Sequence, residues 1–295
     1  YEKAAELGAA GVLIDWDDFA ELSGVIPLLA RVYPNGKADV NHFHAAGGMG
    51  FLIRELLCEG LLHRDVSTIM GEGLDAYTVE TKLGNSNELT YEPAPAESGD
   101  QSVLRRCGNA FQPTGGLNML DGNLGSAVIK SSSIPADRHV IEAPARVFHS
   151  QEELHAAFKA GELNRDVVAV VRFQGPKACG MPELHRMTPP LAVLQGRGFR
   201  VALVTDGRMS GASGKVPAAI HLTPEAVDGG PIAKIRDGDI IRLDADNGVL
   251  QLLVDAAEFG LRQPVEIDLA KNQSGTGREL FAAFRNITGA ASQGA

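Results

Sequence analysis

A glycine-rich turn at residues 206–215 carries the residue types that bind an anion and move a proton. Ser210 lies in this turn between Arg208 and Lys215. The turn follows an apolar run, residues 199–204, that predicts a buried strand. Glycines let a backbone present its N–H groups to a ligand, and strand ends of layered α/β proteins commonly carry functional residues. The turn therefore predicts an anion-binding site that contains a serine.

Two familiar motifs do not fit this turn. A hydrolase nucleophile elbow needs G-x-S-x-G, whereas Ser210 lies in the sequence GRMSG. A Walker A loop, G-x-x-x-x-G-K-[ST], fails because Met209 takes the place of its first glycine and Val216 that of its hydroxyl residue. The sequence therefore argues against both a serine hydrolase and a P-loop NTPase.

Longer segments around the turn match a known family. The matching segments are residues 206–211, 173–177, 180–183, 221–226 and 229–233. Together they resemble the dihydroxyacid and 6-phosphogluconate dehydratase family. Further segments lean toward its 6-phosphogluconate branch, namely Met209 and residues 212–220, 111–117 and 32–37. The resemblance runs over nearly the whole chain, which makes it far more specific than a single glycine motif.

The resemblance implies an architecture. Family members are about twice as long as these 295 residues, and the chain begins with Tyr1, so it resembles their C-terminal half. The expected fold is α/β with a β-rich part. We expect residues 1–95 to be the last segment of an α/β N-terminal domain. Residues 96–295 would form a compact, β-barrel-like C-terminal domain that swivels against it.

The resemblance also implies a reaction. The expected enzyme is a hydro-lyase that converts 6-phospho-D-gluconate to 2-dehydro-3-deoxy-6-phosphogluconate. It would use Mg²⁺ and a 4Fe–4S cluster whose cysteine ligands lie in the other half, and the full-length protein would be a homodimer. Two alternatives stay open: a dehydratase of a non-phosphorylated sugar acid or a branched 2,3-dihydroxy acid, and a non-catalytic anion-binding module. This chain alone would be inactive.

Five residues are the candidates for the site. By the resemblance, Ser210 is the catalytic base and Glu183, 27 positions earlier, is a ligand of Mg²⁺. Arg208, Ser213 and Lys215 would bind the substrate, because a carboxylate and a phosphate need cationic and hydroxyl donors. Each has an ordinary alternative: a serine bonded within its own turn, a solvated loop cation, or a glutamate paired with a neighbouring arginine. That neighbour would be Arg186, and Asp206 would cap the turn or orient Arg208.

The histidines and cysteines are expected to be structural. The sequence H-F-H at residues 42–44 places two imidazoles on one side of an extended segment, but no third ligand lies at a telling distance. We expect the same structural role for His185 and His221. Cys58, Cys107 and Cys179 match no cluster motif of the family and lack C-x-x-C spacing, which predicts packed thiols.

Composition excludes some partners. The formal net charge of −10 argues against nucleic acid and anionic membrane surfaces, which both favour clustered Lys and Arg. No run approaches the roughly 20 apolar residues of a transmembrane helix. Three widely spaced cysteines are typical of a reduced cytoplasmic protein.

Periodicity predicts the elements that position the turn. Asp18 and Glu21 indicate a helix start, with apolar spacing up to Ala30. Other helices are expected at 49–59, at 278–287 and after the capping residue Ser150; the last of the chain would bury Leu280, Phe281 and Phe284. Strands are expected at 167–173 and 199–204, with a hairpin of 240–243 and 249–254 around an Asn-Gly turn. Residues 84–100 have the composition of a linker.

Overall fold

The computed structural model describes residues 11, 14–210 and 214–294. The contacts of the chain divide it into two compact units. One consists of residues 22–116, and the other combines residues 1–21 with residues 117–295. The division into domains at residues 95 and 96 concerns the whole protein and stays a prediction.

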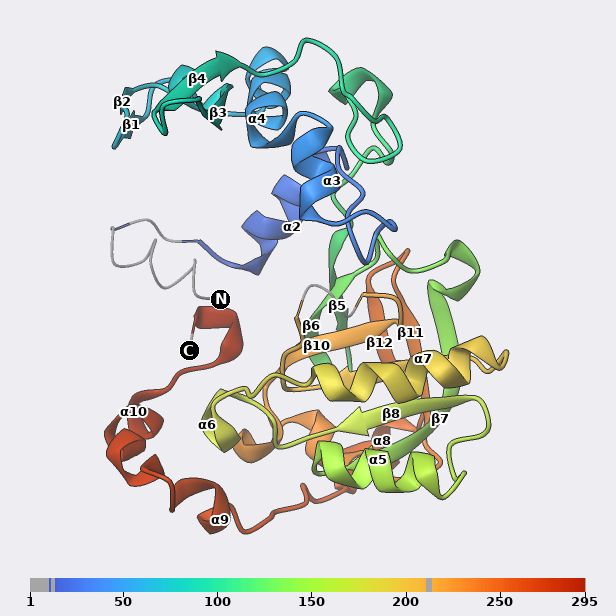
Figure 1. Ribbon diagram of the computed structural model, residues 1–295. Helices are drawn as coiled ribbons and strands as arrows, with labels where there is room; N and C mark the ends of the chain where they lie inside the picture. Colours follow the sequence, from blue (N-terminus) through green and yellow to red (C-terminus); the bar gives the residue numbers. More distant parts are fainter. Residues whose placement is uncertain (1–10, 12–13, 211–213, 295) are drawn as a thin grey trace. The chain divides into compact units, whose positions relative to one another are not determined.

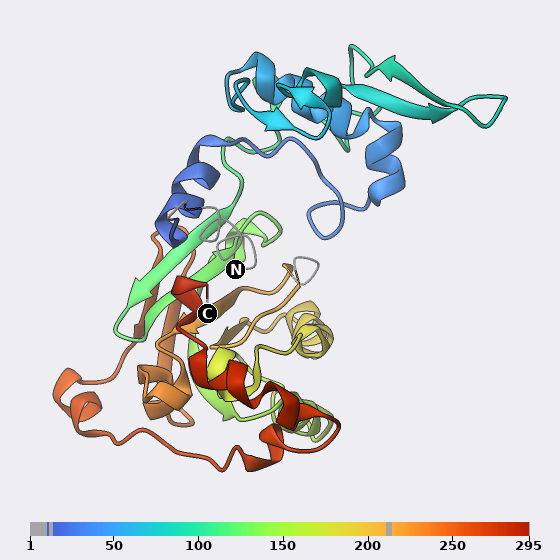
Figure 2. The ribbon, with the colours of Figure 1, turned by 90° about the vertical axis from the view of Figure 1, so that its left-hand side faces the viewer.

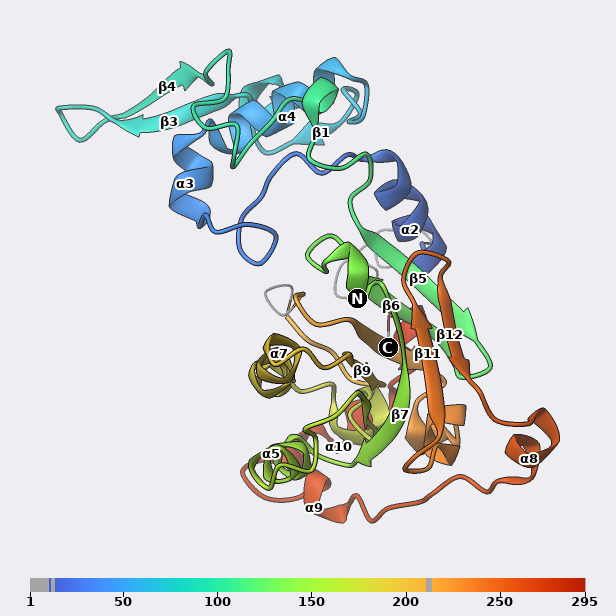
Figure 3. The same ribbon diagram turned by 90° about the vertical axis from the view of Figure 1, so that its right-hand side faces the viewer.

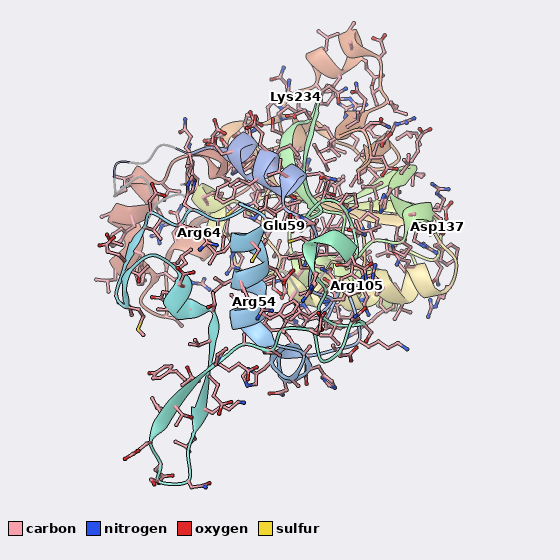
Figure 4. The ribbon with its side chains drawn as sticks, turned by 90° about the horizontal axis from the view of Figure 1, so that it is seen from above. Arg54, Glu59, Arg64, Arg105, Asp137 and Lys234 are labelled. Carbon is pink, nitrogen blue, oxygen red and sulfur yellow. The ribbon has the colours of Figure 1, made fainter. Side chains whose placement is uncertain are left out.

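The unit of residues 22–116 is built around one helix. Its elements are the end of α2 (Trp16–Val25), α3 (Val40–Ala45), α4 (Gly48–Cys58) and two hairpins, β1 (Ser67–Thr68) with β2 (Gly71–Glu72) and β3 (Val79–Leu83) with β4 (Leu89–Pro93). Phe51 of α4 is fully buried against Leu104 and Val103. Arg54, labelled on α4 in Figure 4, donates to the carbonyl oxygens of Ala94 and Pro95 at 2.9 and 2.7 Å.

Three expectations for the first part of the chain were wrong. Residues 84–88 are not a linker but the turn of the β3–β4 hairpin, which Figure 2 shows as a long ribbon, and Gly84 N–H donates to the Glu88 oxygen at 2.8 Å. The helix α2 ends at Val25 and does not reach Ala30, because Pro27 disfavours helical geometry in the residue before it. Asp15, not Asp18, caps this helix, by accepting from the N–H of Asp17.

The other unit contains a closed barrel. Its strands are β5 (Leu117–Gly122), β6 (Gly125–Lys130), β7 (Val140–Phe148), β8 (Val167–Val171), β9 (Val201–Thr205), β10 (Ala218–Thr223), β11 (Ile240–Asp244) and β12 (Val249–Leu252). They close in the order β10-β6-β5-β12-β11-β7-β8-β9 (Figures 1 and 3). The expected mixture of α/β and β-barrel character is therefore confirmed. The strands expected near β8, β9, β11 and β12 are confirmed within a few residues.

One part of the barrel is parallel, and this part positions the site. The strands β7, β8, β9 and β10 run parallel to one another, whereas β10 pairs antiparallel with β6, and β6 with β5. Every residue of β8 and β9 is buried, which explains their unbroken apolar sequences. Inward-facing side chains such as Leu120, Ile129 and Leu250 fill the barrel interior.

Helices connect β7 to β8 and β8 to β9, as crossovers between parallel strands commonly do. Apart from the start of α2, the α-helices among the described residues of this unit are α5 (Gln151–Lys159), α6 (Pro176–Cys179), α7 (Thr188–Gly196), α8 (Ala256–Leu261), α9 (Ala270–Gln273) and α10 (Ala282–Ile287). The Ser150 hydroxyl accepts from Glu153 N–H at 3.2 Å, so the predicted cap of α5 is confirmed. Leu154 of α5 and Leu191 and Leu194 of α7 pack on β8 and β9 in a second apolar core.

The last expected helix forms, but it is not buried. It is a 3-10 turn, Arg278–Phe281, continued by α10. Leu280, Phe281 and Phe284 expose 78, 55 and 63% of their surface. Helical periodicity predicts that these side chains share a face, but it cannot predict whether another element covers that face.

We expect hydrogen exchange to separate the strongest from the weakest part of the chain. Amides of β8 and β9 lie between two apolar cores and should exchange only through global unfolding, whereas the β3–β4 hairpin, exposed along most of its length, should exchange through local opening. Mass spectrometry of the peptides around both pairs measures this. Equal protection of the two pairs would contradict the expectation.

Candidate functional site

The candidate site lies in two loops that follow neighbouring parallel strands. Residues 172–184 follow β8 and residues 206–217 follow β9. Because the carboxyl ends of parallel strands meet at one edge of a sheet, these loops come together although they are distant in sequence. Glu183 and Arg208 form an isolated parallel bridge between them. The close approach requires Gly207, since a Cβ there would lie 2.5 Å from the Leu184 side chain.

The Glu183 carboxylate accepts hydrogen bonds from two residues of the Ser210 turn. Its Oε1 accepts from the Ser210 backbone N–H at 2.9 Å, and its Oε2 accepts from Arg208 Nη1 at 3.1 Å. Arg208 Nε also donates to the Met181 carbonyl oxygen at 2.9 Å. The alternative pairing of Glu183 with Arg186 is not found, because Arg186 pairs with Glu152 at 3.7 Å and Glu183 with Arg208. The structure thus joins three of the predicted site residues.

A buried carboxylate anchors the base of the same turn. Asp206 accepts from the backbone N–H groups of Phe173 and Gln174 at 3.0 and 2.9 Å, and from that of Ala226 at 2.9 Å. Burial raises the pKa of Asp206, and these hydrogen bonds act in the opposite direction. Asp206 therefore joins two neighbouring segments to its own turn. Neither of the two roles considered for it, capping the turn or orienting Arg208, appears in these hydrogen bonds.

A second buried carboxylate lies close by. Glu225 accepts from the N–H groups of Lys177 and Ala178 at 2.9 and 3.2 Å. Burial raises the pKa of Glu225 to about 7, and the charges of Asp206 and Asp228 act in the same direction. Gly175 makes this packing possible, since a Cβ there would lie 2.2 Å from a Glu225 oxygen.

A cavity of about 320 Å³ adjoins the serine. This Ser210 cavity is lined by Trp16, Phe19, Leu117, Met119, Val128, Lys130, Met209, Ser210, Gly214, Val216, Ala218, Ile220 and His221. Alternate residues of β5, β6 and β10 face it, while Leu120, Ile129 and Ala219, on the opposite side of the same strands, are buried in the barrel core. The cavity is therefore on the outer face of the barrel wall, and its residues all belong to one unit.

His221 lies on the wall of this cavity. Its backbone N–H donates to the Gly207 oxygen at 2.8 Å, and its φ of 57° is unusual for a residue with a side chain. Burial lowers its pKa to about 4, helped by the charge of Arg208, so the ring is neutral at neutral pH. The expected structural role of His221 stays a prediction, and nothing in the sequence placed it beside Ser210.

The remaining candidates are less closely joined. Lys215 is exposed and does not line the cavity, and its backbone oxygen accepts from Gln195 Nε2 at 3.1 Å. Ser213 lies outside the described residues. In the other unit, His42 contacts Asp39 at 2.7 Å within the capping box of α3, a structural use.

The described residues do not complete a metal or cluster site. Within residues 14–210 and 214–294, no group of three His, Cys, Asp or Glu side chains is placed to hold a metal ion. The Cys179 thiol donates to the Phe173 oxygen at 3.4 Å, and burial raises its pKa to about 12, which disfavours the thiolate that iron requires. Cys58 is exposed and so is not the packed thiol that we expected. Glu183 offers one hard oxygen donor suited to Mg²⁺.

Comparison with known proteins decides the family. The model of the dihydroxy-acid/6-phosphogluconate dehydratase C-terminal domain matches residues 102–295, and that of the N-terminal domain matches residues 4–77. The chain belongs to this family. The Ser210 turn lies within the residues that the C-terminal model matches, so the resemblance found in the sequence is confirmed. No described helix is long and apolar enough to cross a membrane.

Named relatives point to one branch of the dehydratase family. A phosphogluconate dehydratase of Rhizobium meliloti (strain 1021) is 62% identical over 286 residues, and one of Escherichia coli (strain K12) is 57% identical over 287 residues. Both alignments cover 97% of this chain but 47% of the relative. A dihydroxy-acid dehydratase of Acetivibrio thermocellus is 37% identical over 256 residues, 85% of this chain and 43% of the relative. The chain spans about half the length of these curated relatives.

Glu225 should make stability depend on pH. Its pKa is about 7 in the folded chain against an ordinary 4.5, so between these values the unfolded chain binds fewer protons. Stability therefore falls as pH rises from about 4.5 to about 7, by at most about 3.4 kcal/mol. We expect Glu225→Gln to reduce this fall in urea unfolding curves.

The exposed residue Glu266 provides the control, because Glu266→Gln should leave the pH dependence unchanged. A fall of the same size in Glu225→Gln and in the parent chain would show that Glu225 is not its source.

Proposed function

We propose that this chain contributes part of the active site of a dehydratase that converts 6-phospho-D-gluconate to 2-dehydro-3-deoxy-6-phosphogluconate. The observation that carries the proposal is the position of Ser210, whose family turn lies on a cavity wall and whose N–H is held by Glu183. The phosphogluconate dehydratases at 57 and 62% identity support the substrate.

The reaction requires a base near C2 of the sugar acid. The C2 proton is removed, the C3–O bond breaks, and the hydroxyl leaves with a proton as water. The resulting enol then rearranges to the 2-keto product. In this scheme Ser210 takes the C2 proton, and the backbone contact to Glu183 keeps the serine turn in place at the cavity.

A serine hydroxyl is too weak an acid to act as a base without help. In this family, bound Mg²⁺ and the iron–sulfur cluster would supply the positive charge that lowers the pKa of the serine hydroxyl. Among the described residues Glu183 is the candidate ligand of Mg²⁺, and the remaining ligands would come from elsewhere in the whole protein. The cluster cysteines would also lie outside this chain.

Arg208 is the candidate for the substrate carboxylate. Its guanidinium now contacts Glu183, and about 45% of its side chain is exposed to solvent. A cation held by Glu183 would repel this guanidinium and favour its contact with a substrate anion instead. Ser213 and Lys215 belong to the same turn and are proposed as further substrate contacts.

Other features of the whole protein belong to the same proposal. A barrel domain that swivels against an α/β N-terminal domain, a homodimer and a cytoplasmic location rest on the family resemblance. So does the inactivity of residues 1–295 alone.

Substrate choice tests the function. We expect the anaerobically prepared full-length protein to dehydrate 6-phosphogluconate in preference to gluconate and 2,3-dihydroxyisovalerate. Preference for 2,3-dihydroxyisovalerate would instead support the activity named for the Acetivibrio thermocellus relative. No turnover of any of the three would favour a non-catalytic anion-binding module.

Ser210→Ala should abolish turnover in the full-length protein. The change removes the proposed base but no candidate cluster or metal ligand, so iron content and substrate affinity should stay close to the parent values. Steady-state rates, iron analysis and equilibrium substrate binding measure the three properties. The exposed Ser67→Ala is the matched control, and activity of Ser210→Ala within a few-fold of this control would exclude Ser210 as the base.

Glu183→Gln should weaken Mg²⁺ binding and turnover together, because it replaces a charged oxygen donor with a neutral one. A titration of activity against Mg²⁺ measures both. Glu152→Gln is the control, since Glu152 is an exposed acid beside Arg186 with no contact to the Ser210 turn among the described residues. A metal titration of Glu183→Gln that matches this control would leave Glu183 as a purely structural partner of Arg208.

A further inference from the structure

The Ser210 cavity has one cationic side chain on its wall. Of the residues that line the cavity, all in the described part of the chain, Lys130 alone carries a positive charge at neutral pH, because His221 is neutral there. Lys130 ends β6, where it is paired with Leu117 of β5. No motif in the sequence singled out this lysine.

The backbone of the serine turn packs against this lysine. A Cβ built on Gly214 would lie 3.5 Å from Lys130 Cδ and 3.0 Å from Ser133 Oγ. Glycine at this position therefore lets the turn approach the end of β6. Ser131, the residue after Lys130, is also held in place. Its hydroxyl accepts from Asn118 Nδ2 at 3.1 Å, and the same amide donates to the Ala245 oxygen at 3.2 Å.

Partial burial makes this lysine responsive to an anion. Loss of hydration lowers the pKa of Lys130. An anion in the cavity would replace the lost hydration of the ammonium, and such charge-assisted contacts are among the stronger hydrogen bonds in proteins. Lys215, the lysine that the sequence pattern favoured, is exposed and would gain less from the same contact.

Bond counts in the substrate distinguish its two anionic groups. Ser210 follows the end of β9 and Lys130 ends β6, with β10 between these strands, so the two residues reach the same cavity from different strands. The carboxylate carbon is bonded directly to C2, so it must stay close to Ser210. The phosphorus is six bonds from C2, and an extended chain advances about 1.2 Å per bond, which gives about 7 Å. The phosphate therefore lies farther from Ser210 than the carboxylate does.

We propose that Lys130 binds the phosphate group of the substrate in the Ser210 cavity, while Ser210 faces C2 at the other end. This assignment rests on the proposed dehydratase function. It also fixes the orientation of the substrate in the cavity, with the sugar chain lying across β10 between the two residues. It also makes Lys130, in place of Lys215, the residue that separates a phosphorylated sugar acid from its unphosphorylated analogue.

The test compares three lysine variants in the full-length enzyme. Lys130→Met keeps the length of the side chain and removes its charge, Lys130→Arg keeps the charge, and Lys215→Met removes the rival charge. Lys159→Met, on the exposed face of α5, is the matched control. The measurements are the KM for 6-phosphogluconate and the inhibition constants of gluconate and inorganic phosphate as competitors. Thermal unfolding of each variant checks that it folds.

We expect Lys130→Met to raise the KM for 6-phosphogluconate and the inhibition constant of phosphate by about 10- to 150-fold. The inhibition constant of gluconate should change less than about 3-fold, because gluconate lacks the phosphate. Lys130→Arg should stay within about 5-fold of the parent enzyme, since charge-assisted phosphate binding is retained. Lys159→Met should match the parent.

Three results would overturn the assignment. An unchanged KM in Lys130→Met would remove Lys130 from the substrate site, and equal losses for 6-phosphogluconate and gluconate would place it at the carboxylate. A phosphate-selective loss in Lys215→Met alone would restore the rival. Failure of the parent enzyme to dehydrate 6-phosphogluconate would instead contradict the proposed function, so the two failures are distinguishable.

Discussion

The site depends on the burial of one carboxylate, that of Asp206. This group has no exposed surface, and it accepts hydrogen bonds from three backbone N–H groups in two other segments, at Phe173, Gln174 and Ala226. A buried carboxylate without partners would be very costly, so these segments must stay where their N–H groups reach it. The loop after β8, the turn after β9 and the segment after β10 are thereby held as one group. Ser210, which lines the cavity, is only four residues beyond Asp206 in the sequence.

Much of this arrangement could be predicted from the sequence. The features that could not be predicted depend on contacts between distant parts of the chain. The strands before both loops are unbroken apolar runs, and the Asn-Gly turn and the Ser150 cap are local signals that the structure confirms. Two local signals were missed: Pro27, which explains the early end of α2, and the alternating strands of the β3–β4 hairpin. The exposed face of α10 is different in kind, because the burial of a helix is decided by elements that its own sequence does not describe.

The candidate residues divide along the same line. A motif can predict that Ser210, Arg208 and Glu183 act together, and their hydrogen bonds bring them together. No motif contains Lys130, and the matched segment that contains His221 does not place it at a cavity. Both residues reach the cavity because β6 and β10 are neighbours in a barrel whose closure is a long-range property. Lys215 shows the opposite case: it lies in the motif, yet it is exposed and is not among the residues that line the cavity.

The buried charges beneath the site are matched mainly by the backbone and not by one another. Asp206 and Glu225 accept from peptide N–H groups, and the buried Arg172 donates to the carbonyl oxygens of Ile232, Ala233 and Ile235 at 3.0 to 3.3 Å. Peptide dipoles are fixed by the fold, so these charges need no mobile counter-ion. Arg208 instead pairs with the partly exposed Glu183, and Lys130 lies on the wall of the Ser210 cavity. A fold that stabilises its internal charges through the backbone can thus leave a side-chain cation at a cavity, where the proposed anionic substrate would meet it.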